Sequence, residues 1–442
     1  MRIGLIAMSG VRAVDTELLQ LGLTLPGFIE RGRVVASLPS LGLLTLAGMT
    51  PRHHRCVYHE VQALHELAAL PREFDLVAIS SLSAQIGEAY ELADRYRALG
   101  VPLVMGGLHV TAVPDEAARH ADAVVIGEGE SVWLDLLDDA QAHALQSFYK
   151  ADGRFSLDDA PMPAYELLDI EKYNRLTVQT SRGCPFQCEF CASSVLLTSR
   201  YKQKPVAKVL AEIDRIRQFW RRPFIEFADD NAFVNHRYWK ELLPELKTRK
   251  VRWFAETDLS VHEDDELLDL MRQSGCAEVL IGFESPGEWG LRGVELKSDW
   301  KRKHWQDAKE AIARIQAHGI RVNACFILGL DGQGVDIFDR VLEFVLETEP
   351  FDVQITVQTP FPGTPLHSRL EREGRLLNPT AWETCTLFDI NFRPQLMTPR
   401  ELRTGFRDLG VKLYSQELTD RRRAHFEQTY REAAHLWEEL KG

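Results

Sequence analysis

The sequence lacks an excess of positive charge and lacks any long hydrophobic run. Its 442 residues carry 52 lysines and arginines against 65 aspartates and glutamates, a formal net charge of −13. This acidic total argues against a nucleic-acid footprint, which needs a basic face. No apolar run approaches the length of a membrane span, and the first residues, MRIGLIAMSG, are too short for a signal-peptide core. We therefore expect a cytoplasmic protein that binds no nucleic acid and has no transmembrane segment.

Two motifs are also missing. No G-x-G-x-x-G fingerprint lies in the first βα turn, which argues against a nicotinamide cofactor. Only one C-x-x-C pair exists, which argues against a structural zinc site. Of the seven cysteines, three stand in one loop, which fits a reducing compartment and a metal rather than disulfides. The other four, Cys56, Cys276, Cys325 and Cys385, are scattered, and we expect them to act as small buried hydrophobes.

The chain is organised around residues 176–199, LTVQTSRGCPFQCEFCASSVLLTS. A short strand breaks at Gly183 and delivers Cys184, Cys188 and Cys191 on one tight loop. Soft sulfur ligands select iron–sulfur clusters or zinc over hard cations. On an iron–sulfur cluster, three cysteines leave one iron open for a small molecule. On a zinc ion, the fourth ligand would come from elsewhere in the chain, where the nearest downstream histidine is His236.

Residues 1–140 alternate apolar strands with helical segments, which predicts a doubly wound, Rossmann-like parallel sheet. We expect strands at 3–7, 57–58, 76–80, 102–105 and 123–126, with helices at 86–99, 116–120 and 131–137. Ligands of such sheets bind beyond the carboxyl ends of the strands. Small and polar residues gather at those ends and form a candidate binding site: Ser80, Ser81, Ser83, Gly106, Gly107, His109, Gly127, Glu128, Gly129 and Glu130.

Residues 141–175 predict an extended linker, and α/β alternation resumes in residues 176–365. Six strands, at 177–180, 223–227, 253–257, 277–283, 322–327 and 353–357, predict a partial βα barrel of the TIM type, whose active groups sit at the carboxyl ends of the strands. Polar residues at those ends are Asp229, Asp230, Glu256, Asp258, Glu284, Ser285, Gly329, Asp331, Thr359 and Thr364. Residues 366–442 predict a helical tail, with helical spacing over 366–375 and 399–431.

The segment GCPFQCEFC resembles the cluster loop of the radical S-adenosylmethionine (SAM) enzymes. The resemblance implies a [4Fe-4S] cluster on Cys184, Cys188 and Cys191, with SAM chelated at the open iron. It also implies that Asp229 and Asp230 in FADDN, and Glu284 in IGFESP, line the SAM pocket. Gly329 in ILGLDG matches the small residue near the adenine. The G-G-E stretch that often follows the second strand is absent, and FADDN stands in its place.

Residues 37–49, DLVAISSLS, GGLHVTAVP and VVIGEGE together resemble the cobalamin-binding domain that precedes many radical SAM domains. The motif D-x-H-x-x-G, whose histidine coordinates cobalt in other cobalamin proteins, is absent. The resemblance therefore implies cobalamin bound without a protein histidine on cobalt, or a degenerate domain that binds none. Residues 381–402 resemble a C-terminal domain found in hopanoid-methylase relatives.

These resemblances imply a cobalamin-dependent radical SAM enzyme that methylates an unactivated carbon of a small-molecule or lipid substrate. An electron donor such as flavodoxin or ferredoxin would supply the reductant. Two alternatives remain open. The first is a radical cyclisation or rearrangement without methyl transfer, and the second is a non-catalytic cobalamin- or metal-binding regulator.

Overall fold

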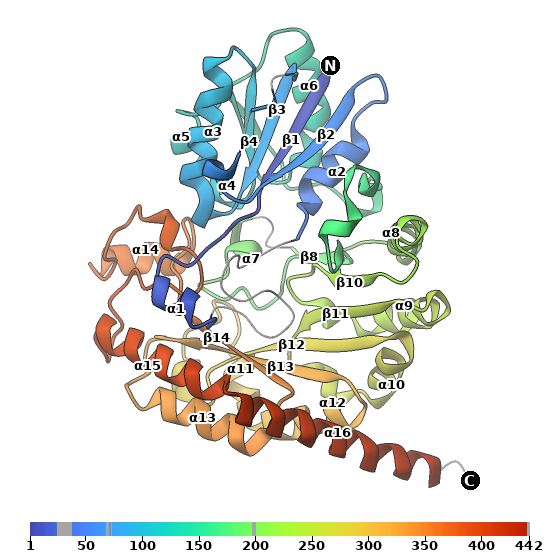
Figure 1. The fold of residues 1–442 in the computed structure, drawn as a ribbon, viewed down its shortest axis with the longest axis vertical. Helices are drawn as coiled ribbons and strands as arrows, with labels where there is room; N and C mark the ends of the chain where they lie inside the picture. Colours follow the sequence, from blue (N-terminus) through green and yellow to red (C-terminus); the bar gives the residue numbers. More distant parts are fainter. Residues whose placement is uncertain (24–37, 68–69, 72, 197–199, 440–442) are drawn as a thin grey trace.

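The computed structural model describes residues 1–23, 38–67, 70–71, 73–196 and 200–439. Two six-stranded parallel sheets follow each other along the chain, and the first stands above the second in Figure 1. In the described residues, no helix combines the length and the apolar content needed to cross a bilayer.

The first sheet has the strand order β2-β1-β3-β4-β5-β6, and every neighbouring pair is parallel. Helices cover both of its faces, with α3, α4 and α5 on one side and α2 and α6 on the other, so the doubly wound prediction is confirmed. The strands are β1 (Arg2–Met8), β2 (Arg55–Val61), β3 (Leu76–Ser81), β4 (Leu103–Gly106), β5 (Ala123–Ile126) and β6 (Phe148–Lys150). The helices are α2 (Leu41–Met49), α3 (Ile86–Ala98), α4 (Leu108–Ala112), α5 (Pro114–Ala117) and α6 (Trp133–Gln141).

Two local differences from the sequence expectation have simple causes. The helix expected over 116–120 begins earlier, at Pro114, because proline is favoured in the first turn where its missing N–H is not needed. Strand β6 lies at 148–150, inside the segment expected to be a linker, so the first sheet extends beyond residue 140. Three residues are too few to carry a hydrophobic alternation.

The second sheet has the order β14-β13-β12-β11-β10-β7, again with parallel neighbours. The six predicted strands are confirmed as β7 (Leu176–Val178), β10 (Phe224–Phe227), β11 (Arg252–Thr257), β12 (Cys276–Glu284), β13 (Arg321–Leu328) and β14 (Asp352–Val357). The crossover helices are α8 (Val206–Phe219), α9 (His236–Arg249), α10 (Asp265–Ser274), α12 (Ala308–Ala317) and α13 (Ile337–Thr348). Consecutive strands with helical crossovers form the partial barrel.

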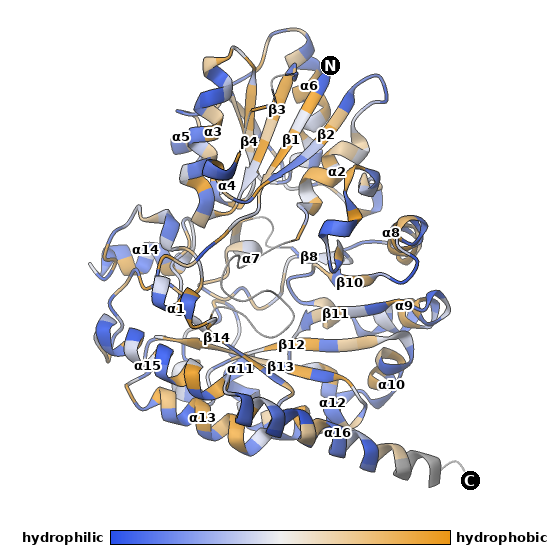
Figure 2. Ribbon diagram, viewed as in Figure 1, coloured by the Kyte–Doolittle hydropathy of each residue, from blue (hydrophilic) through white to orange (hydrophobic). Residues whose placement is uncertain are grey.

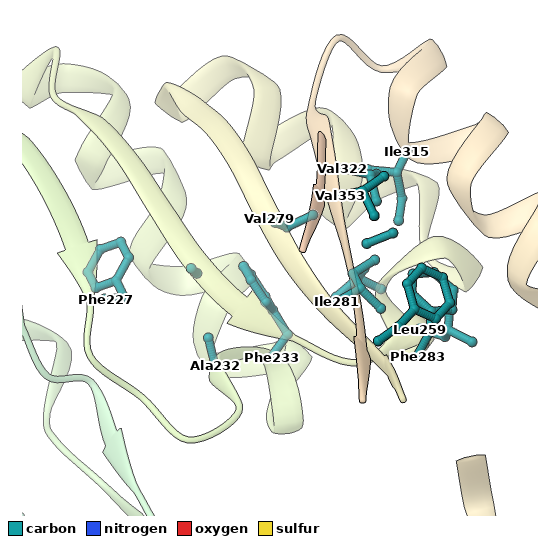
Figure 3. Packing of buried hydrophobic residues seen from close by; sticks show 14 of the residues in the cluster. Phe227, Ala232, Phe233, Leu259, Val279, Ile281, Phe283, Ile315, Val322 and Val353 are labelled. Atoms are coloured by element: carbon teal, nitrogen blue, oxygen red, sulfur yellow. The ribbon is translucent and has the colours of Figure 1, made fainter. Parts of the chain in front are cut away.

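The core of the partial barrel lies between its strands and its outer helices. Figure 3 shows Val279 and Ile281 of β12 beside Val322 of β13 and Val353 of β14, with Ile315 of α12 packed over them. Figure 2 shows hydrophobic colour along the strands and hydrophilic stretches on the outer helices. Burying this apolar surface is the main force that fixes the helices on the sheet.

Between the sheets, the chain makes short local elements. These are α7 (Ala192–Leu196), after the cysteine loop, and an antiparallel pair of β8 (Ser181–Arg182) and β9 (Lys202–Gln203). Helix α11 (Trp300–His304) precedes α12. Figure 1 shows α7 between the two sheets, so the cysteine loop faces the first domain.

The C-terminal region contains α14 (Pro365–Arg372), α15 (Pro399–Leu413) and α16 (Gln416–Glu439). The single helical pattern over 399–431 is therefore two helices, broken after Leu413. The buried Arg422 of α16 donates to the carbonyl of Leu413, which satisfies an acceptor that the break leaves free. This region also holds the start of the chain. Asp389 accepts hydrogen bonds from the backbone N–H groups of Val14 and Asp15, each at 2.8 Å. Arg403 pairs with Asp15 just before α1 (Thr16–Gln20).

Gly405 allows α15 to lie against α13. A β-carbon at this position would stand 2.0 Å from a ring carbon of Phe338. We expect Gly405→Ala to lower the free energy of unfolding by about 1–3 kcal/mol because the two helices must separate. Gly87→Ala in α3 is the matched control, since nothing lies within 4 Å of its added carbon. It should leave stability unchanged or raise it by about 0.5–1 kcal/mol. Urea unfolding of both variants tests the pair, and equal midpoints would contradict it.

Candidate active site

The cysteine loop follows the first strand of the second sheet, and two adjacent aspartates at the end of the next strand fix it. Asp229 accepts from the backbone N–H groups of Thr180 and Ser181, each at 2.7 Å, and from the Thr180 hydroxyl at 2.5 Å. Asp230 accepts from the N–H of Gly183 at 2.7 Å and from the hydroxyl of Ser193. The loop is thus held on both sides of its cysteines.

Cys184, Cys188 and Cys191 line one cavity of about 570 Å³, called the cysteine cavity below. The backbone N–H of Cys191 donates to the carbonyl of Cys188 at 3.0 Å, and Gln187 takes a left-handed φ of 48°, so the loop turns tightly. Burial raises the pKa of the Cys184 thiol to about 11 and raises that of Cys188 as well. In the described residues, no three His, Cys, Asp or Glu side chains converge on one metal ion. A cubane places each of its cysteines on a different iron, so its thiolates do not converge in this way.

Glu284 and Lys301 form a buried pair on the wall of this cavity. Lys301 donates to the Glu284 carboxylate at 2.5 Å and to the Gly282 carbonyl at 2.8 Å. Glu284 ends β12 with φ of 61°, and the pairing of β12 with β13 shifts register between Gly282 and Glu284. Such bulges redirect a side chain at functional sites. Burial alone would lower the pKa of Lys301, but the charges of Glu284 and Cys188 raise it, so Lys301 stays protonated.

Several polar atoms in the cysteine cavity have no partner in the described part of the chain. Asn231 donates to Asp258 at 2.6 Å, but its own oxygen Oδ1 is buried without a hydrogen bond. The oxygen Oε1 of Gln358 is likewise buried and unpaired. An unpaired buried acceptor destabilises a fold unless a ligand supplies a donor. The cavity is therefore suited to a ligand rich in N–H and O–H groups.

A second cavity, of about 520 Å³, lies at the carboxyl ends of β1, β3, β4 and β5 and is called the N-terminal cavity below. Residues of the second domain, Gln179, Arg182 and Ala228, close one side. Eight of the predicted residues line it: Ser80, Ser81, Gly106, Gly107, Gly127, Glu128, Gly129 and Glu130. Gly107 has φ of 109°, and a β-carbon there would stand 3.2 Å from the Ser80 hydroxyl oxygen. Because Gly107 has no side chain, a ligand in the cavity can approach the backbone closely here.

The two glutamates of the GEGE stretch connect the domains through ion pairs. Glu128 pairs with Arg182 at 2.8 Å and with Lys202 at 2.6 Å, while Glu130 pairs with Arg182 at 2.8 Å. The Glu128 side chain is only 1% exposed. Arg182 stands two residues before Cys184, so these bonds join the N-terminal cavity directly to the cysteine loop. We call Glu128, Glu130, Arg182 and Lys202 the interdomain ion network.

Four predicted residues lie elsewhere. Asp229 binds the loop backbone and does not line the cysteine cavity. Gly329, with φ of 90°, packs against Phe392 and Leu402 and also lies outside that lining. His109 is 1% exposed and outside the N-terminal cavity; its Nδ1 is 3.1 Å from the Ser83 hydroxyl, and its ring meets Trp382 edge-on at 5.3 Å. Ser83 lines the cysteine cavity instead.

Sequence reasoning missed several residues of the two cavities. Lys301 lies in a segment with no motif around it, and Lys202 reaches the site through the pairing of β9 with β8, so the fold brings both to the site. Arg182 could have been suspected because it directly precedes Gly183 and Cys184. Cys325 and Cys385 were expected to be buried hydrophobes, but both line the cysteine cavity, and Cys385 comes from the C-terminal region together with Thr386 and Leu387.

Asp229 gives a pH-dependent prediction. Burial raises the pKa of its carboxyl from 3.8 to about 7, outweighing the hydrogen bonds from Thr180 and Ser181 that lower it. The folded protein therefore keeps a proton that the unfolded chain loses, and stability should fall as pH rises from about 4 to about 7. Asp229→Asn removes this titration, so its free energy of unfolding should fall less than that of the wild type across this range. Urea unfolding at several pH values checks this. The exposed Asp159→Asn should follow the wild type, and parallel curves for all three proteins would contradict the prediction.

Comparisons with known proteins agree with this two-cavity arrangement. Residues 31–137 match a B12 binding domain, residues 178–345 match the radical SAM superfamily, and residues 364–441 match a domain of unknown function (DUF4070). An uncharacterized methyltransferase of Synechocystis sp. is 31% identical over 374 residues, which cover 81% of this chain and 67% of that protein. The bacteriochlorophyllide d C-12(1)-methyltransferase of Chlorobaculum tepidum is 26% identical, covering 87% and 84%. The hopanoid C-2 methylase of Rhodopseudomonas palustris is 28% identical, covering 78% and 66%.

Two solved structures share the fold. TsrM from Kitasatospora setae, determined with cobalamin and a [4Fe-4S] cluster, superposes with a TM-score of 0.66 at 15% identity, covering 94% of this chain and 89% of TsrM. The cobalamin-dependent radical enzyme OxsB superposes with a TM-score of 0.65 at 14% identity, covering 97% and 72%. The matches to the family models follow one another along the chain in the order B12 binding domain, radical SAM domain and C-terminal domain.

Proposed function

Because this chain belongs to the cobalamin-dependent radical SAM methyltransferase family, we propose that it methylates an unactivated carbon of a small-molecule or lipid substrate. The family uses a [4Fe-4S] cluster, SAM and cobalamin. Together these groups supply a carbon-centred radical that removes hydrogen and a methyl group that replaces it. The relatives named for bacteriochlorophyllide and hopanoid methylation support a substrate of this class.

One observation carries the proposal: the two cavities adjoin. Leu82 and Leu108 line both the N-terminal cavity and the cysteine cavity. A group bound in one cavity can therefore face a group bound in the other across two apolar side chains. Methyl transfer to a substrate carbon requires both cofactors to reach that carbon, and this arrangement provides the meeting place.

The residues of this chain fit the three groups. Cys184, Cys188 and Cys191 would hold the cluster and leave one iron for SAM. Asp230 and Glu284 supply acceptors that suit the amino and hydroxyl groups of SAM. Ser80, Gly107 and Gly127 would hold cobalamin at the strand ends, where glycine admits a large ligand close to the backbone. No histidine lines the described part of the N-terminal cavity, which fits cobalamin held without a histidine on cobalt.

Other side chains give the cysteine cavity apolar surfaces that exclude water. Phe186 and Phe190 of the cysteine loop, with Leu387 of the C-terminal region, give the cysteine cavity an apolar wall. Phe186 is itself fixed by stacking on Trp300, with ring centres 5.3 Å apart. Excluding water prevents quenching of reactive intermediates. We further propose that the enzyme works in the cytoplasm, where flavodoxin or ferredoxin would supply electrons.

The test uses full-length protein, reconstituted anaerobically with iron, sulfide and cobalamin and reduced with dithionite. Incubation with SAM should yield both 5′-deoxyadenosine, which reports radical formation, and S-adenosylhomocysteine, which reports methyl transfer to cobalamin. 5′-Deoxyadenosine alone would support cyclisation or rearrangement instead. Neither product from protein that carries both cofactors would support a regulator and overturn the proposal.

A further inference from the structure

We propose that the substrate carries a hydrogen-bond-donating group, a hydroxyl, amine or ammonium, which Glu256 receives at the wall of the cysteine cavity. This inference rests on the proposed function, because it concerns the substrate of that reaction. A substrate with an anionic head group, such as a carboxylate or a phosphate, would be disfavoured in this cavity. Glu256 is then a residue that determines specificity.

Glu256 differs from the other carboxylates of the cysteine cavity. Asp230 accepts from Gly183, Asp258 accepts from Asn231 and Ser260, and Glu284 is paired with Lys301. Glu256, on β11, has no hydrogen bond or ion pair with any described residue, and its accessible surface faces the cavity. Glu256 is exposed although it lies inside the cavity, so its carboxylate is open to a ligand and no protein group has to be displaced from it.

Two buried side chains of the same cavity also have an oxygen that could accept a hydrogen bond from a ligand. Gln358 is 2% exposed and Asn231 is 4% exposed, and each has an oxygen without a hydrogen-bond partner in the described structure. These two oxygens and the carboxylate of Glu256 are all acceptors. A ligand that satisfies them must bring N–H or O–H groups.

The charges around the cavity disfavour an anion. Four carboxylates line it: Asp230, Glu256, Asp258 and Glu284. Lys301 is the one cation in the described lining, and it is already bound to Glu284 and the Gly282 carbonyl. A carboxylate or phosphate on the substrate would find no free counter-charge and would be repelled by its neighbours.

The rest of the lining suits an apolar body. Leu280, Ile327, Phe361 and Leu387 contribute hydrocarbon surface to the same lining. Apolar walls with a few fixed polar groups are the usual pattern of small-molecule sites, in which the polar groups set orientation. A donor group held by Glu256 would fix which carbon of the substrate faces the cysteine loop.

The experiment uses three probes that share one eight-carbon chain: radiolabelled octylamine, 1-octanol and octanoate. Equilibrium dialysis measures their binding to full-length protein loaded with cluster, cobalamin and SAM. We expect octylamine and octanol to bind at least about tenfold more tightly than octanoate, the effect of one good hydrogen bond to a charged group. Glu256→Gln removes the charge but keeps an acceptor oxygen. It should weaken octylamine binding about tenfold or more and change octanol binding less.

Glu263→Gln is the matched control, because Glu263 is exposed on the segment that follows β11, and it should bind all three probes as the wild type does. Equal binding of the three probes, absence of binding included, would overturn the inference. So would unchanged octylamine binding by Glu256→Gln. A raised SAM requirement for 5′-deoxyadenosine formation in Glu256→Gln would assign the residue to SAM and overturn it too. Failure of the proposed function is seen separately, as wild-type protein that forms neither 5′-deoxyadenosine nor S-adenosylhomocysteine.

Discussion

Changing Cys184, Cys188 or Cys191 to alanine should abolish reductive SAM cleavage. Each thiolate holds a different iron of the cluster, so two remaining ligands cannot keep it in place. All three line the cysteine cavity, and Asp229 and Asp230 fix the loop that carries them. Iron content and the electron paramagnetic resonance signal of the reduced cluster should fall to background in each variant, together with 5′-deoxyadenosine.

Cys276→Ala separates this loss from a general effect of removing a thiol. Cys276 begins β12, is 7% exposed and lies outside the cysteine cavity. Its removal should cost about 1–3 kcal/mol of stability and leave the cluster and SAM cleavage intact. Cys325 would be a poorer control because it lines the same cavity. A loop variant that keeps a four-iron cluster and cleaves SAM at the wild-type rate would refute the assignment of the cysteines.

Arg182→Met should separate the two halves of the reaction. It leaves Glu130 without a counter-charge and Glu128 with Lys202 alone, and breaking a buried pair in this way costs about 3–5 kcal/mol. The loop at 127–130, which lines the N-terminal cavity, would then be attached to the second domain through the Glu128–Lys202 pair and no longer through Arg182. We expect cobalamin affinity and S-adenosylhomocysteine formation to fall about tenfold or more, while the three cysteines still bind a cluster.

A surface pair provides the control for this prediction. Arg215 and Glu166 lie 3.3 Å apart with side chains 36% and 48% exposed, so Arg215→Met should change stability by less than about 1 kcal/mol. Cobalamin titration and thermal unfolding of both variants give the comparison. If Arg182→Met matched Arg215→Met in melting temperature and in cobalamin affinity, the interdomain ion network would have no role in placing the cofactor.

Much of the fold was predictable because its signals are local. Alternation of apolar strands with amphipathic helices predicted both sheets, and the six strands of the second sheet lie within a few residues of their expected positions. The break between α15 and α16 has no glycine or proline to mark it. Its local signal is Ser415, which accepts from the N–H of Leu418 at the start of α16, while the bond from Arg422 to the Leu413 carbonyl joins two helices and has no local pattern.

The site was less predictable because its partners are distant in sequence. Glu128 and Arg182 stand 54 residues apart and belong to different domains. Asp229 and Asp230 are adjacent in the sequence but differ in whether they line the cysteine cavity. Both follow β10, which ends at Phe227, and both accept hydrogen bonds from the cysteine loop, so the strand pattern did not show which of them lines the cavity. Asp230 lines the cavity and also binds Gly183, while Asp229 binds Thr180 and Ser181 and lies outside the lining.

The attachment of the first residues to the last part of the chain has a consequence for biosynthesis. Val11 lines the cysteine cavity, and the neighbouring Val14 and Asp15 are held by Asp389 and Arg403. Val14 leaves the ribosome about 375 residues before Asp389 does. One wall of the cavity therefore takes its final position only after Asp389 and Arg403 have been synthesised, so the finished pocket can receive its ligands only after that point.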